Sequence, residues 1–138
     1  MLKGIFVLLL MMTLGLAQEH KEKVLDVKEK TKVFFEKTTW RLVSFGNSRM
    51  AVPEKATIRF EDGHYSGNGG CNGVGGNYVK QGESLSFEAG FSTMMACDVL
   101  DLEHKYVKAL SRVNSFNIQG LFLELKENNI TALRFRTK

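Results

Sequence analysis

The chain contains few of the side chains from which catalytic and metal centres are usually built. Its 138 residues include 3 histidines and 2 cysteines. His20, His64 and His104 lie far apart in the sequence, and none has the H-x-x-x-H or C-x-x-C spacing that is typical of metal ligands. We therefore expect surface histidines and no metal site.

The sequence also lacks a nucleotide-binding loop. Gly67 and Gly69 begin a G-x-G-x-x-G pattern, but Asn72 occupies the position of the last glycine, and no Gly-Lys-Ser/Thr follows. Neither cysteine has an obvious neighbouring base that would activate a thiolate. We therefore expect no cofactor, no catalytic residue and no enzymatic activity.

Charge of one sign is not in large excess. The chain has 19 basic and 15 acidic residues, for a net charge of +4. Because lysine and arginine are interspersed with glutamate and aspartate, no basic face with interleaved aromatic residues is formed. This distribution argues against a nucleic-acid partner.

No apolar run is long enough to cross a bilayer, which takes about 20 residues. Residues 5–16 are almost wholly apolar, Lys3 precedes them, and Gly15 and Ala17 supply small residues at a cleavage point. We expect residues 1–17 to be a signal peptide that is cleaved after Ala17, with no membrane span in the mature chain. Gln18 stands where a lipoprotein would need a cysteine, so the prediction is a periplasmic or secreted protein without a lipid anchor.

The two cysteines, Cys71 and Cys97, are a candidate disulfide. An oxidising compartment favours pairing of an even number of cysteines. On the chain-entropy estimate, the loop closed by this pair would stabilise the folded state by about 3.5 kcal/mol. Two free buried thiols are the alternative, because pairing geometry cannot be deduced from sequence. Met94 and Met95, beside Cys97, are expected to fill the core next to the disulfide, since methionine commonly occupies irregular gaps.

The composition changes along the chain. Residues 18–37 are rich in lysine and glutamate, which predicts a charged spacer or a short helix. Within 38–138, runs of β-branched and aromatic residues are separated by turn signals such as Asp62-Gly63 and Asn128-Asn129. The strand residues expected to face the core are Trp40, Leu42, Ala56, Ile58, Phe60, Leu85, Phe87, Leu133 and Phe135.

One helix is expected to interrupt these strands. Leu102, Tyr106 and Leu110 form an i, i+4, i+8 stripe that would pack on a sheet, and Asp98 or Asp101 is expected to cap the helix. The fold class predicted is α+β, mainly β: an antiparallel meander of about seven or eight strands in a half-closed or barrel-like sheet with one packed helix.

Residues 67–76 contain six glycines. Each glycine costs backbone entropy and offers no side chain to bury, so we expect tight turns and close backbone approach here and no packed strand. Asn68, Asn72 and Asn77 are expected to adopt the left-handed conformation, which asparagine tolerates.

From Thr39 to Arg136 the sequence resembles the META domain family, which includes the HslJ-like heat-shock proteins. The order and spacing of several motifs support the resemblance. The residues that carry it are Trp40, Gly67, Gly69, Gly70, Cys71, Asn72, Tyr78, Thr93, Met95 and Cys97.

The resemblance implies a small exported domain with a role in heat shock or antibiotic tolerance and no established enzymatic activity. It suggests a domain that contacts an unidentified envelope protein or a small apolar ligand, and we expect a monomer. The alternative function is redox chemistry or soft-metal handling by Cys71 and Cys97 with Met94 and Met95, since thiolates and thioethers suit Cu(I).

Overall fold

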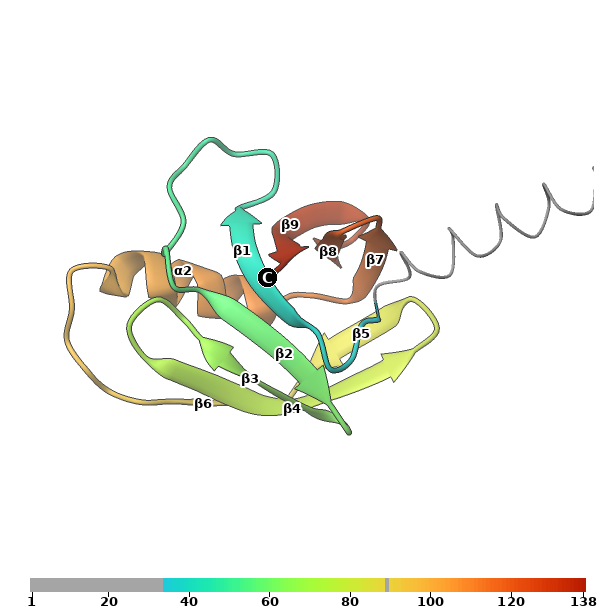
Figure 1. The fold of residues 1–138 in the computed structure, drawn as a ribbon, viewed down its shortest axis with the longest axis horizontal. Coiled ribbons are helices and arrows are strands. Elements are labelled where there is room, and N and C mark those ends of the chain that lie inside the picture. Colours follow the sequence, from blue (N-terminus) through green and yellow to red (C-terminus); the bar gives the residue numbers. More distant parts are fainter. Residues whose placement is uncertain (1–33, 89) are drawn as a thin grey trace, which may run out of the picture. The chain divides into compact units, whose positions relative to one another are not determined.

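The computed structural model describes residues 34–88 and 90–138 (Figure 1). The signal peptide predicted for residues 1–17 and nearly all of the spacer predicted for 18–37 lie outside this part. The strands are β1 (Thr39–Ser44), β2 (Thr57–Glu61), β3 (His64–Asn68), β4 (Gly73–Gln81), β5 (Ser84–Phe87), β6 (Phe91–Ser92), β7 (Ser115–Gln119), β8 (Phe122–Glu127) and β9 (Ile130–Thr137). The helix α2 (Leu100–Leu110) lies between β6 and β7.

The strands form one antiparallel sheet whose hydrogen bonds close into a ring. The strand order is β3-β2-β1-β9-β8-β7-β5-β4-β6, and β3 also pairs with β4. The joint between β5 and β7 consists of one residue pair, Ser84 with Ser115, so the ring is not a true barrel. The predicted class, mainly β with one helix, is confirmed.

The sheet has nine strands in the described residues, whereas the sequence predicted seven or eight. The additional strand is β6, which pairs Phe91 with Gly75 and Ser92 with Val74. A strand of two residues is too short to produce an alternating pattern, so no pattern in the sequence indicated it.

The predicted hairpin turns are present. Asp62 and Gly63 have φ angles of 51° and 80°, and Asn128 and Asn129 have φ angles of 50° and 65°. Two consecutive residues with positive φ are what a tight two-residue hairpin requires. These turns fix the registers of β2 with β3 and of β8 with β9.

The core lies inside the ring and is built from alternate strand residues. The fully buried apolar side chains of the strands are Trp40, Ile58, Phe60, Leu85, Leu123, Leu125, Leu133 and Phe135, with Leu42 nearly so. Phe35, in the last part of the predicted spacer, is also buried, and its ring stacks on Phe60 at 4.1 Å between centroids. The packed domain therefore begins before residue 38.

The helix differs from the prediction at two points. Its N-cap residue is Val99, with no side-chain cap, so neither Asp98 nor Asp101 has the predicted role. Tyr106 and Leu110 are buried as predicted, but the third buried residue is Glu103, while Leu102 is half-buried. The charged Glu103 reaches the interior because it has hydrogen-bond partners there.

The glycine-rich segment also corrects the prediction, because its two ends belong to β3 and β4. A Cβ atom on Gly67 would lie 2.0 Å from the carbonyl oxygen of Thr57, so only glycine allows β2 and β3 to pair here. Within the segment, Gly70 has a positive φ, 125°, whereas the asparagines expected to be left-handed do not. Close approach was predicted correctly; the absence of strand structure and the left-handed asparagines were wrong.

Among the described residues, no helix has the length and apolar character that crossing a membrane requires.

Candidate functional site

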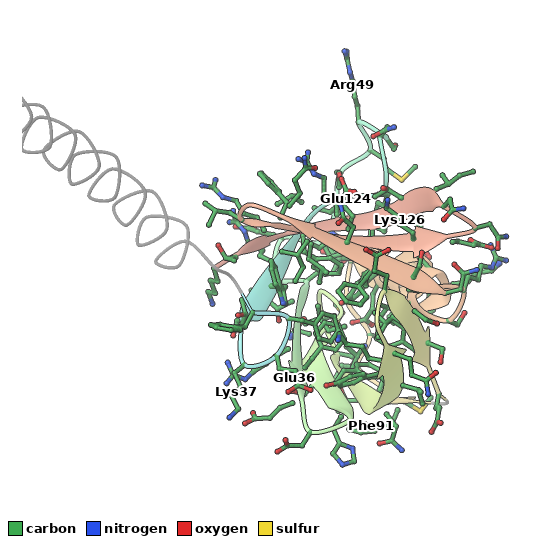
Figure 2. All side chains as sticks on the ribbon, turned by 90° about the vertical axis from the view of Figure 1, so that its right-hand side faces the viewer. Glu36, Lys37, Arg49, Phe91, Glu124 and Lys126 are labelled. Atoms are coloured by element: carbon green, nitrogen blue, oxygen red, sulfur yellow. A yellow bond between two sulfur atoms is a disulfide. The ribbon has the colours of Figure 1, made fainter. Side chains whose placement is uncertain are left out.

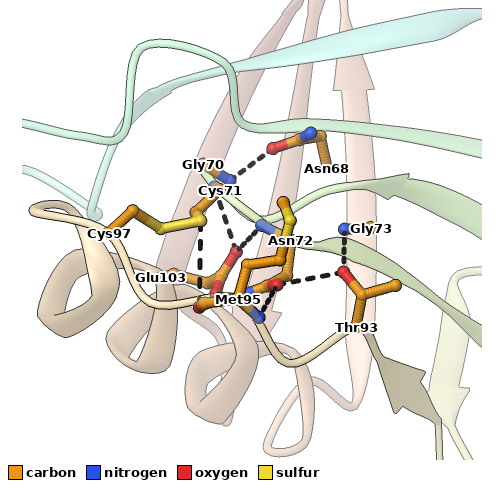
Figure 3. Close-up of a disulfide and its surroundings, with 9 residues drawn as sticks. All are labelled: Asn68, Gly70, Cys71, Asn72, Gly73, Thr93, Met95, Cys97 and Glu103. Atoms are coloured by element: carbon orange, nitrogen blue, oxygen red, sulfur yellow. Dashed lines mark hydrogen bonds between the residues drawn. A yellow bond between two sulfur atoms is a disulfide. The ribbon is translucent and has the colours of Figure 1, made fainter.

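The structure joins Cys71 and Cys97 in a disulfide, the pairing that the sequence had proposed without excluding free thiols (Figure 3). Cys71 lies in the turn between β3 and β4, and Cys97 lies shortly before α2. Their Cα atoms are 6.4 Å apart, although 26 residues separate them in sequence. The bond ties the chain segment that follows β6 to the glycine-rich turn.

A buried carboxylate supports the same turn. Glu103 on α2 accepts hydrogen bonds through Oε1 from the amides of Asn72 (2.6 Å) and Cys71 (3.1 Å). Its Oε2 accepts a third from Asn72 Nδ2 at 2.6 Å. Asn72 and Glu103 are almost completely buried, so each supplies the polar partner that the other needs in the interior.

Asn72 also holds the segment of residues 92–96, which we call the rim segment. Its Oδ1 accepts hydrogen bonds from the amide of Met95 (2.7 Å) and the hydroxyl of Thr93 (3.0 Å). Its Nδ2 donates to the carbonyl of Met95 at 3.2 Å. The amide of Thr93 donates to the carbonyl of Gly73 at 3.1 Å. One side of the rim segment is therefore bonded to β4 and Asn72, as Figure 3 shows.

The hydrogen bonds decide the ionisation of Glu103. Burial by itself raises the pKa of this carboxyl, but the hydrogen bonds from Asn72 and Cys71, with a smaller contribution from His104, outweigh it and hold the pKa below its ordinary value. Glu103 is therefore an anion at neutral pH, and its charge stabilises the turn.

Glycines make this close packing possible. A Cβ atom on Gly69 would lie 2.6 Å from Oε1 of Glu103, and one on Gly75 would lie 2.8 Å from the ring of Phe91. Gly75 thus provides a flat surface on which the Phe91 ring rests. Figure 2 shows Phe91 at the outer edge of the domain, where it is largely exposed.

A hollow of about 680 Å³ lies between the rim segment and α2, and we call it the helix groove. Met94, Met95, Leu100 and Val107 contribute apolar wall, while His104 and Lys108 add polar groups on the helix side. A smaller hollow of about 190 Å³ shares Ser92, Val107 and Ser111 with the groove and continues it towards Phe87 and Phe91.

The methionines contradict their prediction. Met94 is 98% exposed and Met95 is 58% exposed, so neither fills the core beside the disulfide. Because the backbone of Met95 is bound to Asn72 and Cys97 is fixed two residues later, the rim segment lies on the surface and its methionines line the groove.

Sequence reasoning placed Glu103 in the first turn of the helix but assigned it no role in the site, and it did not single out Val107. Glu103 stands at i, i+3, i+7 spacing with Tyr106 and Leu110, and an acidic residue in such a stripe was the available signal. No local pattern pointed to Val107, because it lies beside the buried stripe of the helix. It lines the groove because the rim segment, which forms the opposite wall, passes alongside the helix.

The histidines do not assemble into a site. His64 is exposed and its Nδ1 lies 2.6 Å from Oδ1 of Asn77, His104 is exposed on the groove, and His20 lies outside the described residues. Over residues 34–88 and 90–138, no group of three or more His, Cys, Asp or Glu side chains is arranged to hold a metal ion.

The model of the META domain family matches residues 33–138. The chain belongs to the META domain family. Most of the residues that suggested the resemblance surround the site: Gly69, Gly70, Cys71, Asn72, Thr93, Met95 and Cys97. Trp40 and Tyr78 lie in the core of the META domain, and Gly67, a residue of β3, pairs with Ile58 of β2.

Solved structures share the fold of this META domain. A protein from Burkholderia xenovorans is 26% identical, with a TM-score of 0.63, and the match covers 75% of this chain and 83% of that one. A DUF4847 family protein from Bacteroides vulgatus is 14% identical, with a TM-score of 0.57, covering 75% and 93% of the two chains. The latter similarity shows the fold alone. No curated protein gives a significant match.

Proposed function

We propose that this META domain is an exported, non-enzymatic binding module whose helix groove takes up an extended, apolar segment of another envelope protein. The observation that carries the proposal is the arrangement of the rim segment: one side is firmly bonded to the domain and the other borders an open apolar groove. Three features of the groove support this kind of occupant.

The first is the backbone of the rim segment. Thr93 and Met95 direct their amides to β4 and Asn72. In an extended chain, successive residues point their backbone groups in opposite directions, so the amides and carbonyls of Ser92 and Met94 face the other side. In the described part of the chain, the Met94 amide has no hydrogen-bond partner. Such an edge can pair with an added strand.

The second feature is the chemistry of the walls. Leu100 and Val107 offer apolar surface opposite the two methionines, whose flexible thioether side chains adapt to differently shaped partners. The third is charge. Lys108 supplies a positive charge on the helix side, and the lining anion Glu103 already has both oxygens hydrogen-bonded, so we expect the bound segment to carry an acidic residue near one end.

A binding role also agrees with how the polar groups of the site are used. Both oxygens of Glu103 already accept hydrogen bonds, and both cysteines are joined in a disulfide. The proposal therefore gives these groups a structural role. Export is supported by the sequence of residues 1–17 and by the disulfide, which persists in oxidising compartments.

Binding is tested by the fluorescence anisotropy of a labelled peptide of alternating valine and threonine residues that ends in glutamate. Val107→Glu places a charge in the groove, and Val79→Glu is the matched control, since Val79 on β4 is 46% exposed and Val107 is 38% exposed. We expect binding by the unaltered protein and by V79E, and its loss in V107E. Equal binding by all three would contradict the groove as the site.

A small apolar probe, anilinonaphthalene sulfonate, separates the two kinds of ligand. If V107E abolishes dye binding while no variant binds the peptide, the groove is a small-molecule site and the strand-pairing proposal is overturned.

We place this binding in the envelope stress response, on the strength of the resemblance to HslJ-like proteins. A strain that lacks the gene is complemented with the unaltered chain, V107E or V79E and then exposed to heat or to an envelope-targeting antibiotic. The proposal expects V107E to fail where V79E succeeds. Unchanged survival of the deletion strain would contradict the stress role.

Soft-metal handling is the second candidate, and the exposure of the Met94 and Met95 thioethers favours it. It requires Cu(I) to bind stoichiometrically to reduced protein, and to bind much more weakly when both methionines are replaced by leucine. Absence of binding after reduction of the Cys71–Cys97 disulfide would remove this candidate.

A further inference from the structure

Methionine side chains usually lie in the interior, but the two on the rim segment do not. Met94 is 98% exposed and Met95 is 58% exposed. They are held there, because the amide and carbonyl of Met95 are both bonded to Asn72 and the disulfide fixes Cys97 two residues later. The exposed thioether groups lie where the proposed ligand would have to enter.

A third methionine in the domain has a different environment. Met50 is 48% exposed, and its sulfur accepts a hydrogen bond from Nζ of Lys105 at 3.0 Å. The ammonium group engages a lone pair of this sulfur and so makes it a weaker nucleophile. Met50 is therefore an internal reference for the reactivity of the two rim methionines.

We infer that Met94 and Met95 form an oxidation site that controls the helix groove, with a peroxide-class oxidant as its reactant. The sulfur attacks one peroxide oxygen, a sulfur–oxygen bond forms and the oxygen–oxygen bond breaks. Proton transfer then releases water, or an alcohol if the peroxide is organic. The sulfur is oxidised by two electrons and the peroxide is reduced by two. This inference rests on the proposed function, because it assigns the site its regulation.

Oxidation changes the chemistry of the groove without breaking the fold. A sulfoxide is polar, so a segment that buries it loses apolar contact and must satisfy an additional acceptor. The backbone hydrogen bonds of Asn72 to Met95 do not involve the thioether, so the rim segment keeps its position. Methionine sulfoxide reductases reverse the reaction, which makes the site a reversible switch.

Apart from Met50, the cysteine and tryptophan side chains of the described residues are protected from oxidation. Cys71 and Cys97 are joined in the disulfide, and Trp40 is fully buried. Treatment with hydrogen peroxide therefore tests the methionines with little interference from other groups.

The experiment treats the purified protein with hydrogen peroxide and follows each methionine by peptide mapping and mass spectrometry. We expect sulfoxide to form at Met94 first, then at Met95, and most slowly at Met50. The affinity for the valine–threonine peptide should fall by about tenfold, as expected when a polar group is buried with poor compensation.

Met94→Leu with Met95→Leu is the decisive variant, because leucine keeps the rim apolar and cannot be oxidised. We expect it to bind the peptide before and after treatment, whereas Met50→Leu, the control, should lose affinity like the unaltered protein. Oxidation of Met50 as fast as Met94, or equal loss of affinity in the double variant, would overturn the inference.

If the untreated protein does not bind the peptide, the proposed function fails. The order of oxidation then still decides whether Met94 and Met95 are the reactive pair.

Discussion

Asn72 connects the parts of the site that are distant in sequence. Its side chain accepts hydrogen bonds from Met95 and Thr93 and donates to Met95 and Glu103, so the full capacity of the amide is used. No other common side chain offers two donors and two acceptors at this length. The position of the rim segment therefore depends on one buried amide and on the carboxylate beneath it.

Glu103→Gln tests that carboxylate. Glutamine replaces one charged acceptor oxygen by an amino group, which meets the donors of Asn72 or Cys71. We expect the free energy of unfolding, measured by urea denaturation, to fall by about 2 to 3 kcal/mol. Asp101→Asn, on the exposed side of the same helix, should change it by less than about 0.5 kcal/mol. Equal effects of the two substitutions would contradict the account.

The lowered pKa of Glu103 predicts a pH dependence. Because the folded-state pKa lies below the ordinary value of 4.5, the ionised carboxylate stabilises the fold fully above that pH. The contribution is lost as the pH falls through the lowered folded-state pKa. Urea denaturation over a series of acidic pH values should show this loss, and E103Q should show a smaller loss over the same range.

At the scale of elements, glycines set how closely the strands and helix approach. β2 and β3 pair across Gly67, Glu103 reaches the turn past Gly69, and β4 carries the ring of Phe91 on Gly75. The glycines of this segment therefore allow neighbouring strands and side chains to approach its backbone closely, and its two ends form parts of β3 and β4.

Gly67→Ala and Gly73→Ala test whether a glycine of this segment is required because of close contact with a neighbouring strand. A Cβ atom on Gly67 would lie 2.0 Å from the Thr57 oxygen, whereas one on Gly73 would lie 4.0 Å from its nearest neighbour. We expect G67A to lower the free energy of unfolding by about 2 to 3 kcal/mol and G73A to change it by less than about 1 kcal/mol. Thermal denaturation compares the two, and a harmless G67A would contradict the packing described.

The sequence predicted what depends on neighbouring residues. Alternation identified strands around Trp40, Ile58 and Leu133, and paired turn residues located the hairpins, because both signals are local. The disulfide was proposed from export and from the number of cysteines.

The remaining features depend on distant contacts. Glu103 is buried because Asn72, 31 residues away in sequence, lies beside it. Met94 is exposed because the rim segment is held in place by Asn72 and by the disulfide. β6 exists only because β4 offers it a partner. A pattern within a short window contains none of this information.

At the scale of the whole domain, the ring of strands supplies the core, and the site is attached to its outside. The disulfide, Asn72 and the short strand β6 attach the rim segment to β4, while α2 packs its buried face towards β9 through Tyr106 and Phe135. The groove lies between two parts that are fixed separately, so the rim can be loosened without opening the core.

Removal of the disulfide tests this separation. Cys71→Ala with Cys97→Ala should lower the free energy of unfolding by about 3.5 kcal/mol, the chain-entropy estimate for a loop closed over 26 residues. Limited proteolysis should cleave first within residues 92–96, while the far-ultraviolet circular dichroism of the sheet is retained. Cleavage elsewhere first would contradict the independent attachment of the rim segment.

Backbone hydrogen exchange with and without the valine–threonine peptide tests the central claim most directly. Thr93 and Met95 already donate their amides within the domain. Because backbone groups alternate in an extended chain, we expect the amides of Ser92 and Met94 to face the opposite side, towards the groove. The account predicts that the peptide newly protects Ser92 and Met94 and leaves Thr93 and Met95 nearly unchanged. Protection confined to the outer face of β8 and β9, with none at Ser92 and Met94, would contradict it.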